Sequence, residues 1–190
     1  ESTTSSDAWL NVKAGTDAAL AMAMGHVILK EYYIDKETPY FKEYAKEFTD
    51  MPFLVRVEDI NGAVQPGRFL NAKDLGSKED GADFQTVLID ETTNEIVVPN
   101  GTMGDRHTNP QKWNLRLENR NTGAKIDPRL SVFDQRQDVT VVKLPYFGDE
   151  EHEGVIERAI PTITVQTVDG PVKVTTVYDL ILANYGIDRG

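Results

Sequence analysis

The most constraining feature of this sequence is the run "AALAMAMGHVIL" at residues 18–29, in which only Gly25 and His26 are not apolar. A helix on the surface of a soluble protein usually carries one apolar stripe with polar residues opposite. This run therefore predicts a helix that continues to about Ile34 and is buried on nearly every side. We expect His26 to be a buried side chain whose hydrogen bonds are satisfied.

A glycine turn leads directly into this helix. Thr16 or Asp17 can cap its first turn, and Asp17 adds a favourable negative charge there. Gly15 allows the backbone to approach a ligand closely, while the first amides and the helix dipole favour polar or anionic atoms. The Asp17 carboxylate is an acceptor for paired N–H donors, such as those on a guanine edge. An ordinary helix cap has the same three-residue sequence.

A second helix is predicted in "DKETPYFKEYAKEFTDMP" at residues 35–52. Thr38 stands at the N-cap position, Pro39 follows at the first helical position, and Pro52 closes the segment. The apolar side chains recur at helical spacing, which predicts one buried face. That face comprises Phe41, Tyr44, Ala45 and Phe48.

From residue 53 the pattern changes to short strands and turns. Hairpins are predicted at Asn61-Gly62, across residues 91–94 and at Asp169-Gly170, because these turns lie between strand-like runs. A last helix is expected after Thr175 or Thr176 and before Gly186. This order predicts a mixed α/β (α+β) fold, in which helices from residues 1–52 and 175–190 form one core and residues 53–174 form a β-rich insertion.

Composition excludes several classes of protein. The chain has 190 residues, no cysteine and a net charge of −11, so it offers neither a thiolate nucleophile nor cysteine ligands, and it lacks the basic face that nucleic acids need. No run of about 18 apolar residues predicts a membrane span. The N-terminus has neither an initiator Met nor the pattern of a signal peptide. We therefore expect a chain that was processed or cut from a longer protein.

Other polar clusters carry weaker signals. His26, His107 and His152 match no metal-ligand spacing, and the acidic residues at 149–153 lack the pattern of a calcium loop. The loop at 100–114 is consistent with an ordered turn anchored by Trp113 or with a wall of a substrate funnel or subunit interface. These alternatives stay open.

Six segments together resemble a known family. "WLNVKAGTDAALAMAMGHVILKEYYID" is similar to the segment of molybdopterin-guanine-dinucleotide oxidoreductases, the dimethyl sulfoxide reductase family, in which a pterin nucleotide meets a helix start. The other five segments point to the catalytic alpha subunits of membrane-bound respiratory nitrate reductases. In chain order, they are "YFKEYAKEFTDMPFLV", "VVPNGTMGDR", "KWNLRLE", "LPYFG" and "VTTVYDLILANYGIDRG".

The resemblance implies a fragment of an enzyme that reduces nitrate to nitrite with electrons delivered from quinol through iron–sulfur clusters. Gly15, Thr16 and Asp17 would contact the guanosine part of one pterin nucleotide, within a nucleotide-binding core made by both ends of the chain. The implied cofactors are a molybdenum bis(molybdopterin guanine dinucleotide) and a 4Fe-4S cluster, whose metal ligands lie outside these residues. No residue here is expected to be catalytic or to bind a metal.

The resemblance also implies partners and a location. An iron–sulfur beta subunit and a membrane gamma subunit would attach the parent enzyme to the cytoplasmic face of the cell membrane. The fragment alone is expected to be inactive, to bind neither cofactor, and to self-associate through its exposed core helix. Two alternatives remain: a related molybdenum enzyme acting on nitrite, selenate, chlorate or perchlorate, and a free-standing interaction domain without a cofactor.

Overall fold

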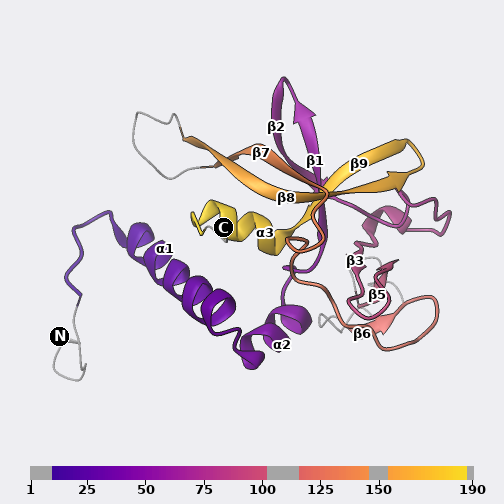
Figure 1. Cartoon of the computed structure of the whole chain (residues 1–190), viewed down its shortest axis with the longest axis horizontal. Coiled ribbons are helices and arrows are strands. Elements are labelled where there is room, and N and C mark those ends of the chain that lie inside the picture. The colour runs from indigo at the N-terminus through magenta and orange to yellow at the C-terminus, as the bar shows by residue number, and fades with distance from the viewer. Residues whose placement is uncertain (1–9, 102–115, 146–153, 188–190) are drawn as a thin grey trace.

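The computed structural model describes residues 10–101, 116–145 and 154–187 (Figure 1). The helical elements are α1 (Asp17–Ile28), the π-helical η2 (Leu29–Asp35), α2 (Pro39–Phe48), the short 3-10 turn η3 (Ala82–Phe84) and α3 (Val177–Asn184). The strands are β1 (Leu54–Ile60), β2 (Ala63–Phe69), β3 (Leu88–Ile89), β4 (Ile96–Val97), β5 (Pro99–Asn100), β6 (Arg116–Asn119), β7 (Asp138–Pro145), β8 (Val155–Thr167) and β9 (Gly170–Thr176). The expected mixed α/β fold is confirmed.

Five strands form one antiparallel sheet in the order β2-β1-β9-β8-β7. The central strand β9 pairs with β1, where Leu54 faces Thr176, and with β8, where Ile163 faces Val174. The two edge strands, β2 and β7, contact each other, so the sheet curls into a partly closed barrel. Two small sheets, β3-β4 and β5-β6, lie below it in Figure 1.

The predicted hairpins are confirmed. Asn61 and Gly62 both have positive φ, 57° and 82°, as the tightest two-residue turns require. The turn before β9 falls on Val168 and Asp169, one residue earlier than predicted, because Thr167 already pairs with Gly170. The residues between β3 and β4 form a turn at the predicted place. Only the length of β8 exceeds the expectation, because it already begins at Val155 and pairs with the whole of β7.

Helix α3 lies between the sheet and the other helices. Its Ala183 packs with Val142 and Ile160 of the sheet, whereas Tyr178 and Leu182 pack with residues of η2 and α2. As predicted, Thr176 caps the helix, since its hydroxyl accepts from the amide of Asp179, and Gly186 (φ 67°) ends it. The last strand and the last helix thus connect the two halves of the core.

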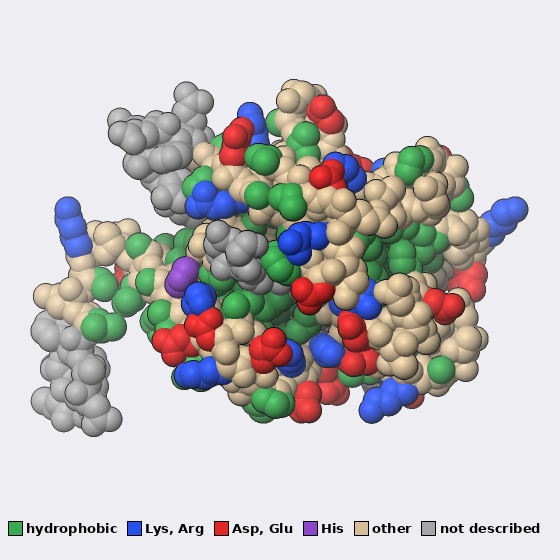
Figure 2. Space-filling view, viewed as in Figure 1, with side chains coloured by type: hydrophobic (Ala, Val, Ile, Leu, Met, Phe, Trp, Pro, Cys, Tyr) green, Lys and Arg blue, Asp and Glu red, His purple; other side chains and the backbone are tan. Residues whose placement is uncertain are grey.

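The predicted burial of α1 is not found within this chain. No residue of this helix is buried, and Met24 and Val27 are about half exposed (55% and 48%). Its half-buried positions include Met22, Gly25 and His26, on a single stripe facing α3. Figure 2 shows hydrophobic side chains uncovered along this helix. The physical reason is that the described part of the chain supplies only one neighbouring element.

The predicted apolar face of α2 is only partly buried. Ala45 is fully buried and Phe41 half-buried, whereas Tyr44 and Phe48 are 47% and 50% exposed. The helix therefore packs on a narrow stripe around its alanine. Tyr44 and Phe48, which are one helical turn apart, lie on the exposed side of α2.

Candidate functional site

The predicted residues Gly15, Thr16 and Asp17 lie together where a tight turn meets α1: Gly15 and Thr16 belong to the turn, and Asp17 is the first residue of the helix. Gly15 has φ 85°, a conformation that favours glycine. The carbonyl oxygen of Lys13 accepts from both the amide (3.0 Å) and the hydroxyl (2.6 Å) of Thr16. These two bonds close the turn and fix the direction in which the helix starts.

The N-terminus of α1 keeps free donor capacity. Thr16 stands at the N-cap position as predicted, but its side chain makes no cap hydrogen bond because the hydroxyl is turned to Lys13. The first helical bond runs from the amide of Leu20 to the carbonyl of Thr16. The first-turn amides therefore point outward at the positive end of the helix dipole, beside the exposed carboxylate of Asp17.

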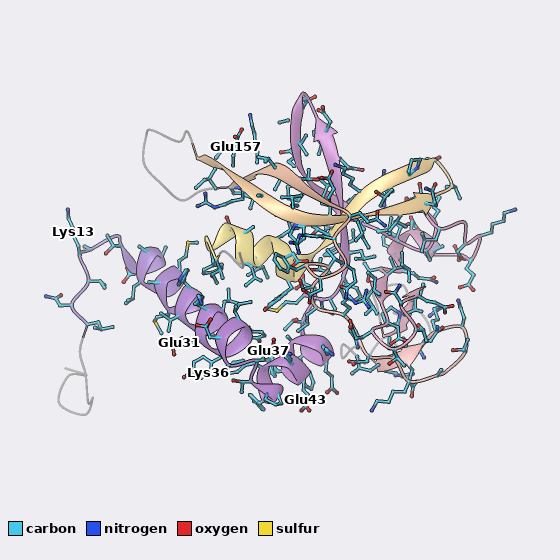
Figure 3. All side chains as sticks on the ribbon, viewed as in Figure 1. Lys13, Glu31, Lys36, Glu37, Glu43 and Glu157 are labelled. Carbon is cyan, nitrogen blue, oxygen red and sulfur yellow. The ribbon has the colours of Figure 1, made fainter. Side chains whose placement is uncertain are left out.

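This turn is open to its surroundings. A Cβ atom added at Gly15 would meet nothing within 4 Å, and Asp17 is exposed. Figure 3 places Lys13 at the outer end of α1, far from the sheet. The turn can offer amide donors and a carboxylate acceptor to a polar ligand from one side. Within the described ranges, no second element reaches the opposite side of such a ligand.

The other end of α1 is fixed to α3. The Nδ1–H of His26 donates to the carbonyl oxygen of Tyr185 (2.9 Å), since a carbonyl can only accept. The expectation that His26 is a satisfied polar side chain is confirmed, although the residue is half-buried rather than fully buried. A Cβ added at Gly25 would lie 2.8 Å from a ring carbon of Tyr185, so only glycine permits this close approach.

Sequence reasoning missed Tyr185 as the anchor of α1. The available signal was Gly25 itself, because a glycine inside a helix is unfavourable unless a neighbour needs the space. His107, His152, Trp113 and the acidic residues at 149–153 lie outside the described residues. Among the residues that the structure describes, no three His, Asp or Glu side chains come together to hold a metal.

A cavity of about 520 Å³ lies between η2, α2 and the loop at 129–135. Its basic side chains are paired: Arg129 binds Glu91 (2.5 Å) and Asn94 (2.8 Å). Lys42 and Lys46 bind Glu37 and Asp127 in the same way. In this described cavity the cations are already neutralised, so it is a poor site for a small anion.

A second ionic cluster ties β1, β2 and the following loop together. The Asp74 carboxylate, only 6% exposed, accepts from Arg68 (2.5 and 2.7 Å), from Arg56 (3.2 Å) and from the amide of Asn71 (3.1 Å). Burial by itself would raise the pKa of Asp74. The hydrogen bonds from Arg68 and Asn71 outweigh burial and hold this pKa below its usual value. With four donors satisfied, the cluster is a structural one.

Similarity to known proteins covers the whole chain. The nitrate reductase alpha chain of Bacillus subtilis (strain 168) is 46% identical over all 190 residues. The chain is homologous to nitrate reductase alpha chains. The respiratory nitrate reductase 1 alpha chain of Escherichia coli (strain K12) is 41% identical over 97% of the chain. The resemblance carried by the six sequence segments is thereby confirmed.

A further relative matches a smaller part of this chain than the nitrate reductase alpha chains do. The perchlorate reductase subunit alpha of Dechloromonas aromatica (strain RCB) is 36% identical over 53% of the chain. The chain spans only 15% and 16% of the length of the two nitrate reductase alpha chains. No protein-family model matches the chain. No helix among the described residues is long and apolar enough to cross a membrane.

Proposed function

We propose that this chain is a segment of the alpha subunit of a respiratory nitrate reductase, an oxidoreductase that converts nitrate to nitrite. The observation that carries the proposal is the 46% identity over all 190 residues to one such alpha chain. The segment contributes part of the site for a pterin guanine dinucleotide and is inactive when separated from the remainder of the subunit.

The open turn at the start of α1 suits the guanosine part of that cofactor. The Asp17 carboxylate can accept from the two neighbouring N–H groups of guanine, and the first-turn amides can donate to ribose or phosphate oxygens. Gly15 lets the nucleotide approach the backbone, since no atom occupies the space beside it. Asp17, Thr16 and Gly15 would thus hold and orient one end of the cofactor.

When bound, the molybdenum group supplies the two-electron transfer of an oxygen atom. This chain supplies neither the metal ligands nor the residues that contact nitrate in our proposal. The bis(molybdopterin guanine dinucleotide) and the 4Fe-4S cluster take their metal ligands from other parts of the subunit. The chain has no cysteine with which to bind the cluster.

The proposed parent enzyme works in a complex. An iron–sulfur beta subunit would pass electrons to the alpha subunit, and a membrane gamma subunit would hold both at the cytoplasmic face. The words "respiratory" and "alpha chain" in the name of the Escherichia coli relative support a complex of several subunits. Purification of the native protein from membranes, followed by identification of its co-purifying subunits, tests this arrangement.

The decisive experiment for the site is Asp17→Ala in the full-length subunit, with Glu43→Ala as the matched control. Glu43 is an exposed acid on α2, far from the turn (Figure 3). Loss of a charge-assisted hydrogen bond costs about 1.5–3 kcal/mol, so we expect roughly tenfold or greater weakening of cofactor retention in Asp17→Ala only. Metal analysis for molybdenum and release of guanine nucleotide by acid measure this loss.

Normal molybdenum and guanine contents in Asp17→Ala would remove this residue from the site. The activity itself is tested on the native polypeptide that contains this chain. A product much larger than 21.2 kDa that carries molybdenum and prefers nitrate over perchlorate, chlorate and selenate supports the proposal. A metal-free product of 21.2 kDa would instead identify an interaction domain.

A further inference from the structure

An exposed apolar band runs along α1, η2 and α2. Its members are large side chains that are between 36% and 68% exposed. Soluble proteins rarely expose a contiguous apolar patch of this kind unless another surface covers it. The band comprises Met24, Ile28, Tyr32, Tyr40, Tyr44 and Phe48.

The first half of the band follows one helical face. Met24, Ile28 and Tyr32 are spaced four residues apart, so they lie one above the other along α1 and into η2. The stripe that faces α3 through Gly25 and His26 is a different one. The contact of α1 with the rest of the described chain therefore leaves this face uncovered.

The second half is a chain of aromatic rings. The ring of Tyr32 lies 5.3 Å from that of Phe41, which lies 5.8 Å from that of Tyr40. Tyr40 continues to Tyr44 (6.4 Å), and Tyr44 to Phe48 (5.3 Å). These contacts join the band across the turn between η2 and α2. They also hold the rings in place before any partner arrives, which lowers the entropic cost of binding.

The lysines beside the band are already paired. Lys30 binds Asp35, Lys36 binds Glu31 (3.4 Å), and Lys42 binds Glu37 (2.5 Å). Each pair joins residues five positions apart. Figure 3 shows Glu31, Lys36 and Glu37 around the end of η2. The lysines along this edge therefore do not call for an acidic partner, and the surface that fits the band is apolar.

We propose that this band is an internal interface, covered in the full-length protein by an apolar surface of the same alpha subunit. The inference rests on the proposed function, since it requires that the chain is part of a longer polypeptide. The alpha chains that it resembles are so long that the chain spans only 15% and 16% of them. The remainder of such a subunit is long enough to supply a segment that packs against the apolar face of these successive helices.

Thiol labelling tests the proposal. Tyr44→Cys and Phe48→Cys are made in the 190-residue chain and in the full-length subunit, and Val139→Cys on the outer side of β7 serves as the control. All three positions are about half exposed in the chain (47%, 50% and 54%), and the chain has no cysteine of its own. A maleimide reagent labels the proteins, and mass spectrometry follows the peptide that contains each introduced cysteine.

We expect both band positions to react at least tenfold more slowly in the full-length subunit than in the 190-residue chain, with a smaller change at position 139. Equal rates at the band positions in the two proteins overturn the proposal. Protection that appears only after other subunits are added also overturns it and assigns the band to another chain. Protection in the short chain that rises with its concentration assigns the band to a second copy.

The same preparations separate this inference from the proposed function. A full-length subunit that contains molybdenum and reduces nitrate, but is labelled freely at positions 44 and 48, refutes the interface alone. A subunit without molybdenum or activity that nevertheless protects both positions refutes the proposed function alone.

Discussion

Among single residues, Asp179 has the most demanding position in the core. It is 1% exposed and accepts from Ser131 (2.7 Å), from the amide of Val132 (2.9 Å) and from Thr176 (2.9 Å). One carboxylate thus ties the loop at 129–135 to the start of α3. A buried carboxylate is stable only when hydrogen bonds replace the water that it loses.

We predict that Asp179→Ala lowers the free energy of unfolding by about 2–4 kcal/mol, because it leaves buried donors without a partner and removes part of the α3 cap. Urea denaturation of the 190-residue chain measures the change. Asp80→Ala is the control, since Asp80 is exposed, and it should change stability by less than about 0.5 kcal/mol. Equal losses in the two variants would contradict the assigned role.

The lowered pKa of Asp74 predicts how the free energy of unfolding depends on pH. Its pKa is below the usual value in the folded chain, so its stabilising contribution is complete above the usual pKa of 3.8 and is lost as pH falls through the folded pKa. We expect Asp74→Asn to flatten the fall in unfolding free energy below about pH 4. Denaturation at a series of pH values compares it with the unchanged chain. An unaltered slope in the variant would contradict the assignment.

At the scale of elements, α2 shows how a helix can be predicted while its buried face is not. Its boundaries follow from Thr38 and Pro39, which are local signals. Its packing depends on Leu29, Tyr33 and Leu130, which meet around Ala45 from distant parts of the chain. The small side chain of Ala45 allows that close approach.

We predict that Ala45→Met destabilises the chain by about 1–3 kcal/mol through overpacking, whereas Tyr44→Met costs less than about 1 kcal/mol. Both substitutions keep a good helix former, so propensity contributes little to the difference. Thermal unfolding of the two variants measures it. Similar losses would mean that both residues are buried, as the apolar spacing alone suggests.

The sequence predicted those parts of the fold that local physics determines. Asn61-Gly62 specifies its turn through backbone geometry, and Thr176 with Gly186 bounds α3 through capping. The last hairpin was predicted with its turn one residue too late, since the turn falls on Val168 and Asp169. The order of strands in the sheet could not be predicted in this way, because β1 pairs with the distant β9. Only the packing of the whole chain decides such a partner.

The candidate site was predictable as a local turn but not as a complete site. Gly15, Thr16 and Asp17 are neighbours in sequence, so their proximity follows from the chain itself. The hydroxyl of Thr16 nevertheless turns to Lys13 instead of capping the helix, because a nearby carbonyl competes for it. Whether the three residues bind a nucleotide stays a prediction.

At the scale of the whole molecule, α1 contributes no buried side chain to the core of the described chain. No residue of this helix is buried, whereas η2 contributes Leu29 and Tyr33 to the core. We predict that the chain from residue 29 onward keeps cooperative unfolding, with a loss below about 2 kcal/mol for the contact of α1 with Tyr185. Circular dichroism during thermal unfolding measures this.

A second truncation, which begins at residue 49, is the matched comparison. It also removes η2 and α2 and exposes Leu130, Tyr178 and Leu182 to water. Burial of each such side chain is worth about 1.5–3 kcal/mol, so this variant should unfold at a much lower temperature or lose cooperativity. A chain from residue 29 that behaves equally poorly would show that α1 is essential.

The place of β9 in the sheet has a consequence for synthesis on the ribosome. β1 ends at residue 60, but its partner β9 begins at residue 170. During translation the β1-β2 hairpin therefore keeps the free edge of β1 unpaired until the β8-β9 hairpin has left the exit tunnel of the ribosome. Pairing over such a separation makes folding slow, and an open strand edge can pair with other nascent chains. Chaperones that shield strand edges should therefore matter most late in translation.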